Sequence, residues 1–177
     1  MDNLIKEMRE EELKLFIIFN YKTSLLDRSF SKTNLFAVKK KEFRKKILET
    51  IKELIKKVDA NKLKNSDVRE KIKELTNIDK KNISFGQAQK VVNLCLKQYC
   101  FLLNKKELYK ELDCPLDSTT MKGYKEKGIG HNRMIDVTED DYKKYQNFFK
   151  GENKGLGILE DCKYYNIRIN KFLNSDK

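Results

Sequence analysis

"FRKKILETIKELIKKV", residues 43–58, decides the fold class through the spacing of its apolar residues. These residues recur three and four positions apart: Phe43, Ile47, Leu48, Ile51, Leu54, Ile55 and Val58. That spacing places them on one face of an α-helix, and lysines fill much of the remaining circumference. The stretch therefore predicts a core helix with a basic outer surface.

The same helical period continues through most of the chain, which contains one proline and seven glycines. It predicts helices over residues 3–20, 67–77 (with Asp67 as N-cap), 86–103, from 117 or 118, from 138 and over 158–172. No internal repeat and no low-complexity linker separates them. We expect an all-α fold, a compact bundle of about six or seven helices in a single domain over residues 1–177.

The charge of the chain indicates its class of partner. Lysine and arginine number 39 against 27 acidic residues, so 39 − 27 gives a net charge of +12. Such a surplus favours a polyanion such as nucleic acid. A gene composition that enriches lysine would explain the same charge without a partner.

Other compositional features limit the remaining possibilities. No apolar run approaches the roughly 18 residues of a membrane span, and the start of the chain is acidic. We therefore expect a cytoplasmic monomer that does not contact a membrane. The four cysteines are irregularly spaced and His131 is the only histidine, so the pattern suggests neither a zinc nor an iron–sulfur site. Reduced, mostly buried thiols are the expectation.

A helix–hairpin–helix element is predicted at about residues 67–103. A short helix, the connector NIDKKNIS at 77–84 and a long helix opening at Gly86 form it. Glycine permits a close turn, and the unpaired N–H groups at a helix start can hold a phosphate. Gly86, Gln87 and Gln89 are therefore predicted DNA contacts, with Lys97 farther along the same helix.

The motifs GQAQK at 86–90 and PLD at 115–117 resemble those of the helix–hairpin–helix DNA glycosylases, most of all the archaeal 8-oxoguanine glycosylases. The resemblance covers about 35 residues, and Ala88 stands where the family's hairpin has a second glycine. It implies that Lys90 is a nucleophile and Asp117 its partner. It also implies a double-stranded DNA substrate with a damaged or modified base, and no metal or cofactor.

The chemistry of such an enzyme explains these residue types. A lysine amine attacks C1′ of a flipped-out nucleotide, which displaces the base and leaves a Schiff base that can eliminate the 3′ phosphate. The amine must be neutral, so a site of this kind has to lower the lysine pKa from its usual value near 10.4. Asp117 would stay ionised, stabilise the positive charge on the sugar and cap the next helix.

Each of these two residues also has a structural interpretation. Lys90, Asn93 and Lys97 lie on one arc of their helix, opposite its apolar face, where a lysine is often simply solvated. Asp117 follows Pro115 and is a common type of N-cap residue. The order of the two residues in the chain favours the catalytic interpretation of both.

Further candidate contacts come from other parts of the chain. Lys45 and Lys46 belong to the basic surface of the 43–58 helix and are predicted to meet DNA phosphates. His131, Asn132 and Arg133 belong to the glycine-punctuated stretch GIGHNRM at 128–134 and contact DNA or form an exposed loop. Phe30 and Phe36 would stack on a flipped base or belong to the core.

Two functions from different classes remain open at this point. The first is a DNA glycosylase, with a lyase step that can accompany base release through a lysine Schiff base. The alternative is a non-catalytic basic helical module that binds DNA or RNA, in which Lys90 and Asp117 are structural. A helical protein that binds another protein is a third interpretation, and it leaves the charge unexplained.

Overall fold

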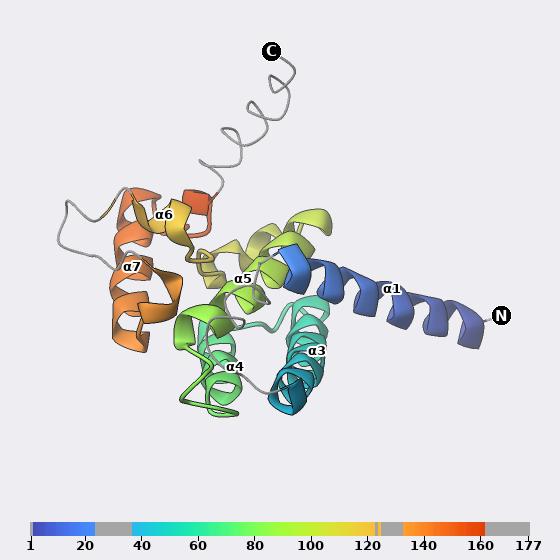
Figure 1. Ribbon diagram of the computed structural model, residues 1–177. Helices are drawn as coiled ribbons and strands as arrows, with labels where there is room; N and C mark the ends of the chain where they lie inside the picture. The colour runs from blue at the N-terminus through green and yellow to red at the C-terminus, as the bar shows by residue number, and fades with distance from the viewer. Residues whose placement is uncertain (1, 24–36, 123, 125–132, 162–177) are drawn as a thin grey trace, which may run out of the picture.

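Helices make up all the regular structure in the computed structural model, which describes residues 2–23, 37–122, 124 and 133–161 (Figure 1). The all-α prediction is confirmed. The α-helices are α1 (Asp2–Thr23), α3 (Ala37–Asp59), α4 (Asn65–Thr76), α5 (Phe85–Leu102), α6 (Ser118–Lys122) and α7 (Glu139–Glu152), and the 3₁₀ turns are η1 (Lys106–Glu111) and η3 (Met134–Asp136).

Helix α5 is the central element of the bundle. It contacts α1, α3, α4, η1, η3 and α7, and it lies between α7 on one side and α3 on the other (Figure 1). Most of its residues are buried, on its polar as well as its apolar side. A helix surrounded in this way holds its side chains in fixed positions, which suits a functional site.

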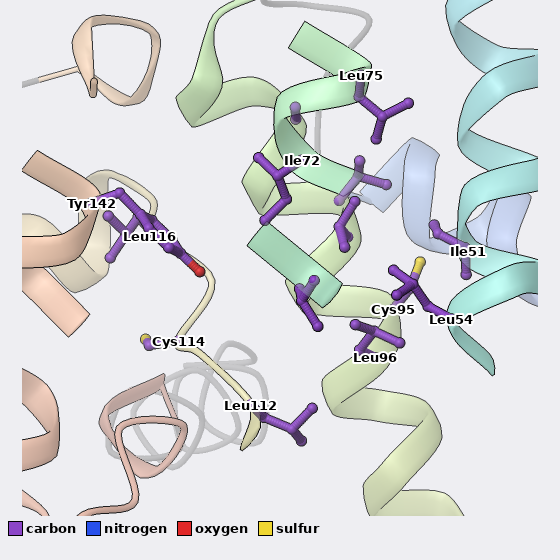
Figure 2. Close-up of a cluster of buried hydrophobic side chains, with 14 of the residues drawn as sticks. Ile51, Leu54, Ile72, Leu75, Cys95, Leu96, Leu112, Cys114, Leu116 and Tyr142 are labelled. Carbon is purple, nitrogen blue, oxygen red and sulfur yellow. The ribbon is translucent and has the colours of Figure 1, made fainter. Parts of the chain in front are cut away.

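The apolar stripe of α3 packs as its spacing predicts. Phe43, Ile47, Ile51, Leu54, Ile55 and Val58 are all buried. Figure 2 shows Ile51 and Leu54 of α3 facing Cys95 and Leu96 of α5. Side chains of α4 complete this part of the core, so α3, α4 and α5 share one buried apolar cluster.

Local capping sets where the helices begin. The Thr138 hydroxyl accepts a hydrogen bond from Asp141 N at 3.2 Å, which confirms Thr138 as the cap of α7. The prediction for Asp67 is wrong, because α4 begins at Asn65. Asp67 lies in the first turn, where its carboxylate accepts from Lys64 N at 3.1 Å.

Helices α4 and α5 pack together and are joined by residues 77–84. The helix–hairpin–helix element at residues 67–103 and phosphate binding by it stay predictions. Among the described helices, none combines the length and the low charge that a membrane span requires.

Candidate catalytic site

Helix α5 presents Lys90 from its second turn. The helix begins at Phe85, and the Ser84 hydroxyl caps it by accepting from Gln87 N at 3.2 Å, while Ser84 N donates to Gln87 Oε1 at 2.8 Å. This capping box fixes the helix start one residue earlier than the prediction at Gly86. Lys90 therefore lies beyond the first turn, on which the positive end of the helix dipole mainly acts.

Lys90 and Asp117 lie together. The Nζ atom of Lys90 is 3.7 Å from Asp117 Oδ2, and the two side chains are 15% and 17% exposed. At this separation the contact is an ion pair and not a hydrogen bond. The other oxygen, Oδ1, accepts from Thr119 N at 2.8 Å and from Thr120 N at 3.0 Å. One carboxylate oxygen therefore caps α6 while the other faces the amine.

A buried segment at residues 112–116 brings Asp117 to α5. Two glutamines hold its backbone in the way that a neighbouring strand would. Gln146 of α7 accepts from Cys114 N and donates to Cys114 O, both at 2.8 Å. Gln89 of α5 accepts from Leu116 N at 3.1 Å and donates to Leu116 O at 2.8 Å. These bonds satisfy backbone groups that burial would otherwise leave without water.

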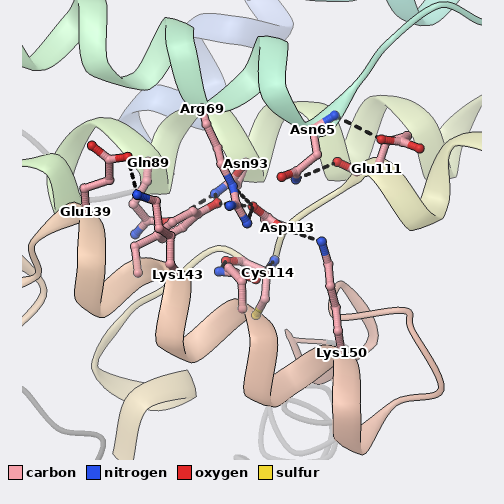
Figure 3. A network of polar contacts seen from close by, with 12 residues as sticks. Asn65, Arg69, Gln89, Asn93, Glu111, Asp113, Cys114, Glu139, Lys143 and Lys150 are labelled. Atoms are coloured by element: carbon pink, nitrogen blue, oxygen red, sulfur yellow. Dashed lines mark hydrogen bonds and ion pairs between the residues drawn. The ribbon is translucent and has the colours of Figure 1, made fainter.

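Asp113, in the same segment, is the centre of a buried polar network (Figure 3). Its side chain is fully buried, and Oδ2 accepts from Arg69 Nε at 3.2 Å, Arg69 Nη2 at 3.1 Å and the Tyr142 hydroxyl at 2.9 Å. Lys150 Nζ lies 3.1 Å from Oδ1. Burial and the nearby carboxylate hold the pKa of Tyr142 well above its usual value, so its hydroxyl remains a donor. The network fixes the segment to α4 and α7.

Lys97 is buried, which does not fit its prediction as a DNA contact. Its amine pairs with Asp161, and the two side chains are 6% and 8% exposed. Asn93 is also buried and donates to the Tyr142 hydroxyl at 2.8 Å. The arc through Lys90, Asn93 and Lys97 is therefore covered by protein along most of its length and is not a solvated face.

Gly86, Gln87 and Gln89 are likewise buried and do not present groups to DNA. A Cβ atom added to Gly86 would lie 1.8 Å from the carbonyl oxygen of Met134. The glycine is therefore required because η3 packs directly on the start of α5, where the sequence suggests a phosphate. Gln87 serves in the cap and Gln89 holds the backbone of Leu116.

The other predicted contacts have different surroundings. Lys45 is exposed on α3, whereas Lys46 lies 3.6 Å from Glu49. Arg133 is exposed and donates to both carboxylate oxygens of Asp136, at 2.7 and 2.8 Å. Four candidates lie outside the described residues: Phe30, Phe36, His131 and Asn132.

The described cysteines are buried and reduced, as expected: Cys95, Cys100 and Cys114. Burial raises the pKa of the Cys100 thiol to about 12, so it stays protonated at neutral pH. Cys162 lies outside the described residues. Within the described part of the chain, no three histidine, cysteine or acidic side chains gather in a way that would hold a metal ion.

The sequence did not identify most of the residues that hold the surroundings of Lys90 and Asp117 in place. Asp113, Gln146 and Asp161 carry no motif, and their partners lie far away in the chain, so no local signal identifies them. The capping box at 84–87 is an exception. Its pattern of serine followed three residues later by glutamine is visible in the sequence and would have placed the helix start correctly.

Comparisons of the chain with protein-family models, curated proteins and solved structures find no match.

Proposed function

We propose that the protein is a DNA glycosylase that uses Lys90 as its nucleophile and Asp117 as the electrostatic partner of the reaction. The observation that carries this proposal is the 3.7 Å separation of the Lys90 amine and the Asp117 carboxylate, both only slightly exposed. The shared transition state of base displacement needs an amine and an anion within this range.

In the proposed reaction, the Lys90 ammonium of the ion pair first gives up its proton to water, and the neutral amine then attacks C1′ of the deoxyribose. A carbon–nitrogen bond forms as the glycosidic bond breaks, and the base leaves with the bonding electrons and takes up a proton. The nitrogen, now bonded to C1′, loses a proton. The C1′–O4′ bond then breaks as O4′ takes up a proton, and a protonated Schiff base forms between C1′ and Nζ. Asp117 stabilises the positive charge that develops on the sugar, and its position is fixed because its other oxygen caps α6.

A nucleic-acid partner accounts for the net charge of +12. The substrate would be a duplex whose damaged or modified base is flipped out, because an amine cannot reach C1′ inside the stack. An oxidised purine is the base that the resemblance implies.

A substrate panel tests this proposal. Duplexes that each contain one oxidised or modified base are incubated with excess protein, and released bases are measured by mass spectrometry. We expect Lys90→Gln to abolish base release and Asp117→Asn to slow it by about 10²–10³. Lys110→Gln, which changes an exposed lysine of η1, is the matched control and should retain activity. Base release at the wild-type rate by Lys90→Gln would refute the proposal.

The second candidate function, a non-catalytic nucleic-acid-binding module, is favoured by a separate observation. The first turns of α3 carry exposed basic side chains, including Lys41, Arg44 and Lys45, and these are remote in sequence from Lys90. Lys90 and Asp117, both partly buried, would then form a structural ion pair.

Salt dependence measures the contribution of this basic surface. If Lys41 and Lys45 each neutralise one phosphate, the double change to glutamine lowers the slope of log affinity against log salt by about 1.8. Lys110→Gln, an exposed lysine of η1, is the control and should leave the slope unchanged. Tight binding to undamaged duplex without any base release would favour the second candidate.

A further inference from the structure

Gln89 is a fully buried side chain whose amide is completely used. Its Nε2 group donates to Gly86 O at 3.0 Å and to Leu116 O at 2.8 Å. Its Oε1 atom accepts from Leu116 N at 3.1 Å and from Asn93 Nδ2 at 3.2 Å. A side-chain amide can donate two hydrogen bonds and accept two, so all of its capacity is used. Exchanging the positions of Oε1 and Nε2 would place the Nε2 donors against the donors Leu116 N and Asn93 Nδ2. The amide therefore has one orientation in this site.

The two bonds to Leu116 act directly on the residue before Asp117. They fix the peptide that enters Asp117, while the Thr120 hydroxyl accepts from Asp117 N at 2.8 Å on the other side. Lys90 is the next residue after Gln89 on the same helix. One turn of α5 thus supplies both the amine and the group that holds the carboxylate against it.

A chain of buried hydrogen bonds supports the Gln89 amide. Asn93 donates to Gln89 and to the Tyr142 hydroxyl, and that hydroxyl donates to Asp113 at 2.9 Å. The chain ends at Arg69, which pairs with Asp113. The Gln89 side chain is therefore anchored to α4 and α7 as well as to its own helix.

We propose that Gln89 is a positioning residue, which keeps the Asp117 carboxylate beside the Lys90 amine by holding the backbone of Leu116. Its effect on rate rests on the proposed glycosylase function, while its effect on the Lys90–Asp117 contact does not. Gln89 itself is fully buried, and its hydrogen bonds go to Gly86, Asn93 and Leu116.

Gln146 provides a matched control for this idea. It makes the same pair of bonds to Cys114, two residues upstream, and it is also fully buried. Gln146→Met and Gln89→Met each remove a glutamine that holds one backbone residue of the segment. Only Gln89→Met removes it next to Asp117, so the two variants separate general loss of stability from loss of position.

The first experiment needs no substrate. The folded wild type and variants are treated briefly with an amine-acetylating reagent, and acetylation of Lys90 is followed by peptide mass spectrometry. Asp117→Asn gives the rate for an amine without its carboxylate partner. We expect Gln89→Met to raise the Lys90 rate nearly as much, because the carboxylate moves away, and Gln146→Met to leave it near wild type.

A second variant keeps the test informative if Gln89→Met does not fold. Gln89→Asn keeps an amide but is one methylene shorter, so it cannot reach both Gly86 O and Leu116, and it should also raise the Lys90 rate. The proposal is overturned if the Gln89 variants leave Lys90 as unreactive as in the wild type. It is equally overturned if Gln146→Met raises the rate by the same factor.

The second experiment measures base release at saturating protein together with DNA affinity. Gln89→Met should slow release with unchanged affinity, and its effect should largely disappear in the Asp117→Asn background, because both changes act through one carboxylate. Additive effects would contradict a positioning role. If the wild type releases no base while the Lys90 labelling behaves as expected, the glycosylase proposal fails and the assignment of Gln89 stands.

Discussion

The substitution Gly86→Ala changes the free energy of unfolding in two opposite ways, through helix propensity and through packing. Alanine is favoured over glycine inside a helix by up to about 1 kcal/mol, so a solvated helix start would gain stability. Here the added Cβ would lie 1.8 Å from Met134 O, 2.9 Å from Met134 C and 3.2 Å from Val137 Cβ. The nearest atom is backbone, and it must move by about 1.2 Å to reach a tolerable 3.0 Å.

Packing should therefore dominate. Overpacking costs about 1–3 kcal/mol, and a clash with backbone belongs at the upper end, which leaves a net loss of about 2 kcal/mol after the gain in propensity. For a chain of this size that corresponds to a fall in Tm of about 4–8 °C. Urea and thermal denaturation followed by circular dichroism measure both quantities.

Gly151→Ala is the control for this prediction. Gly151 lies in α7, and a Cβ there would meet no atom within 4 Å, so the change should stabilise the protein by about 0.5–1 kcal/mol. If Gly86→Ala is as stable as the wild type but binds DNA more weakly, η3 does not pack on α5 as described. Gly86 would then have the phosphate-binding role that the sequence suggests.

Two further predictions concern charge. Asp113→Asn removes the buried negative charge that pairs with Arg69 and Lys150, and it should lower the free energy of unfolding, measured by urea denaturation, by about 2–4 kcal/mol. Asp140→Asn is the control: its side chain is 85% exposed, so the free energy of unfolding should change by less than about 0.5 kcal/mol. Hydrogen bonds from lysines lower the pKa values of Glu53, Asp67 and Glu139 below their usual 4.5, 3.8 and 4.5. The stabilisation from these ion pairs is complete above the ordinary pKa values and is lost as the pH falls through the lower pKa values of the folded protein. The urea midpoint should therefore fall between pH 6 and pH 2, and a constant midpoint would contradict these ion pairs.

The helices were predictable because their apolar residues repeat at helical spacing. The stripe from Phe43 to Val58 needs no knowledge of the partner helix, since the spacing alone defines the buried face. The pairing of Lys90 with Asp117 was implied by the resemblance of two short motifs to those of a known family. The two side chains lie together in the structure, and the catalytic role of the pair stays a proposal.

The surroundings of Lys90 and Asp117 were not predictable, because a helical apolar pattern indicates that the polar residues between the apolar ones face solvent. On α5 the polar side is covered by residues 112–116, and the amides of Gln89 and Gln146 hold that segment as a strand would. Lys97 is buried because Asp161, 64 residues away, neutralises it. Such contacts depend on the tertiary fold, so the sequence left these residues as surface contacts or did not identify them.

Covalent trapping tests the central claim most directly. The wild type is incubated with duplex DNA that contains an abasic site or an oxidised purine, borohydride is added, and the DNA-linked peptide is identified by mass spectrometry. If Lys90 forms the Schiff base, the link maps to Lys90, is absent in Lys90→Gln and remains in Lys110→Gln. A link on another lysine, or no link on any substrate that the protein cleaves, would contradict the account.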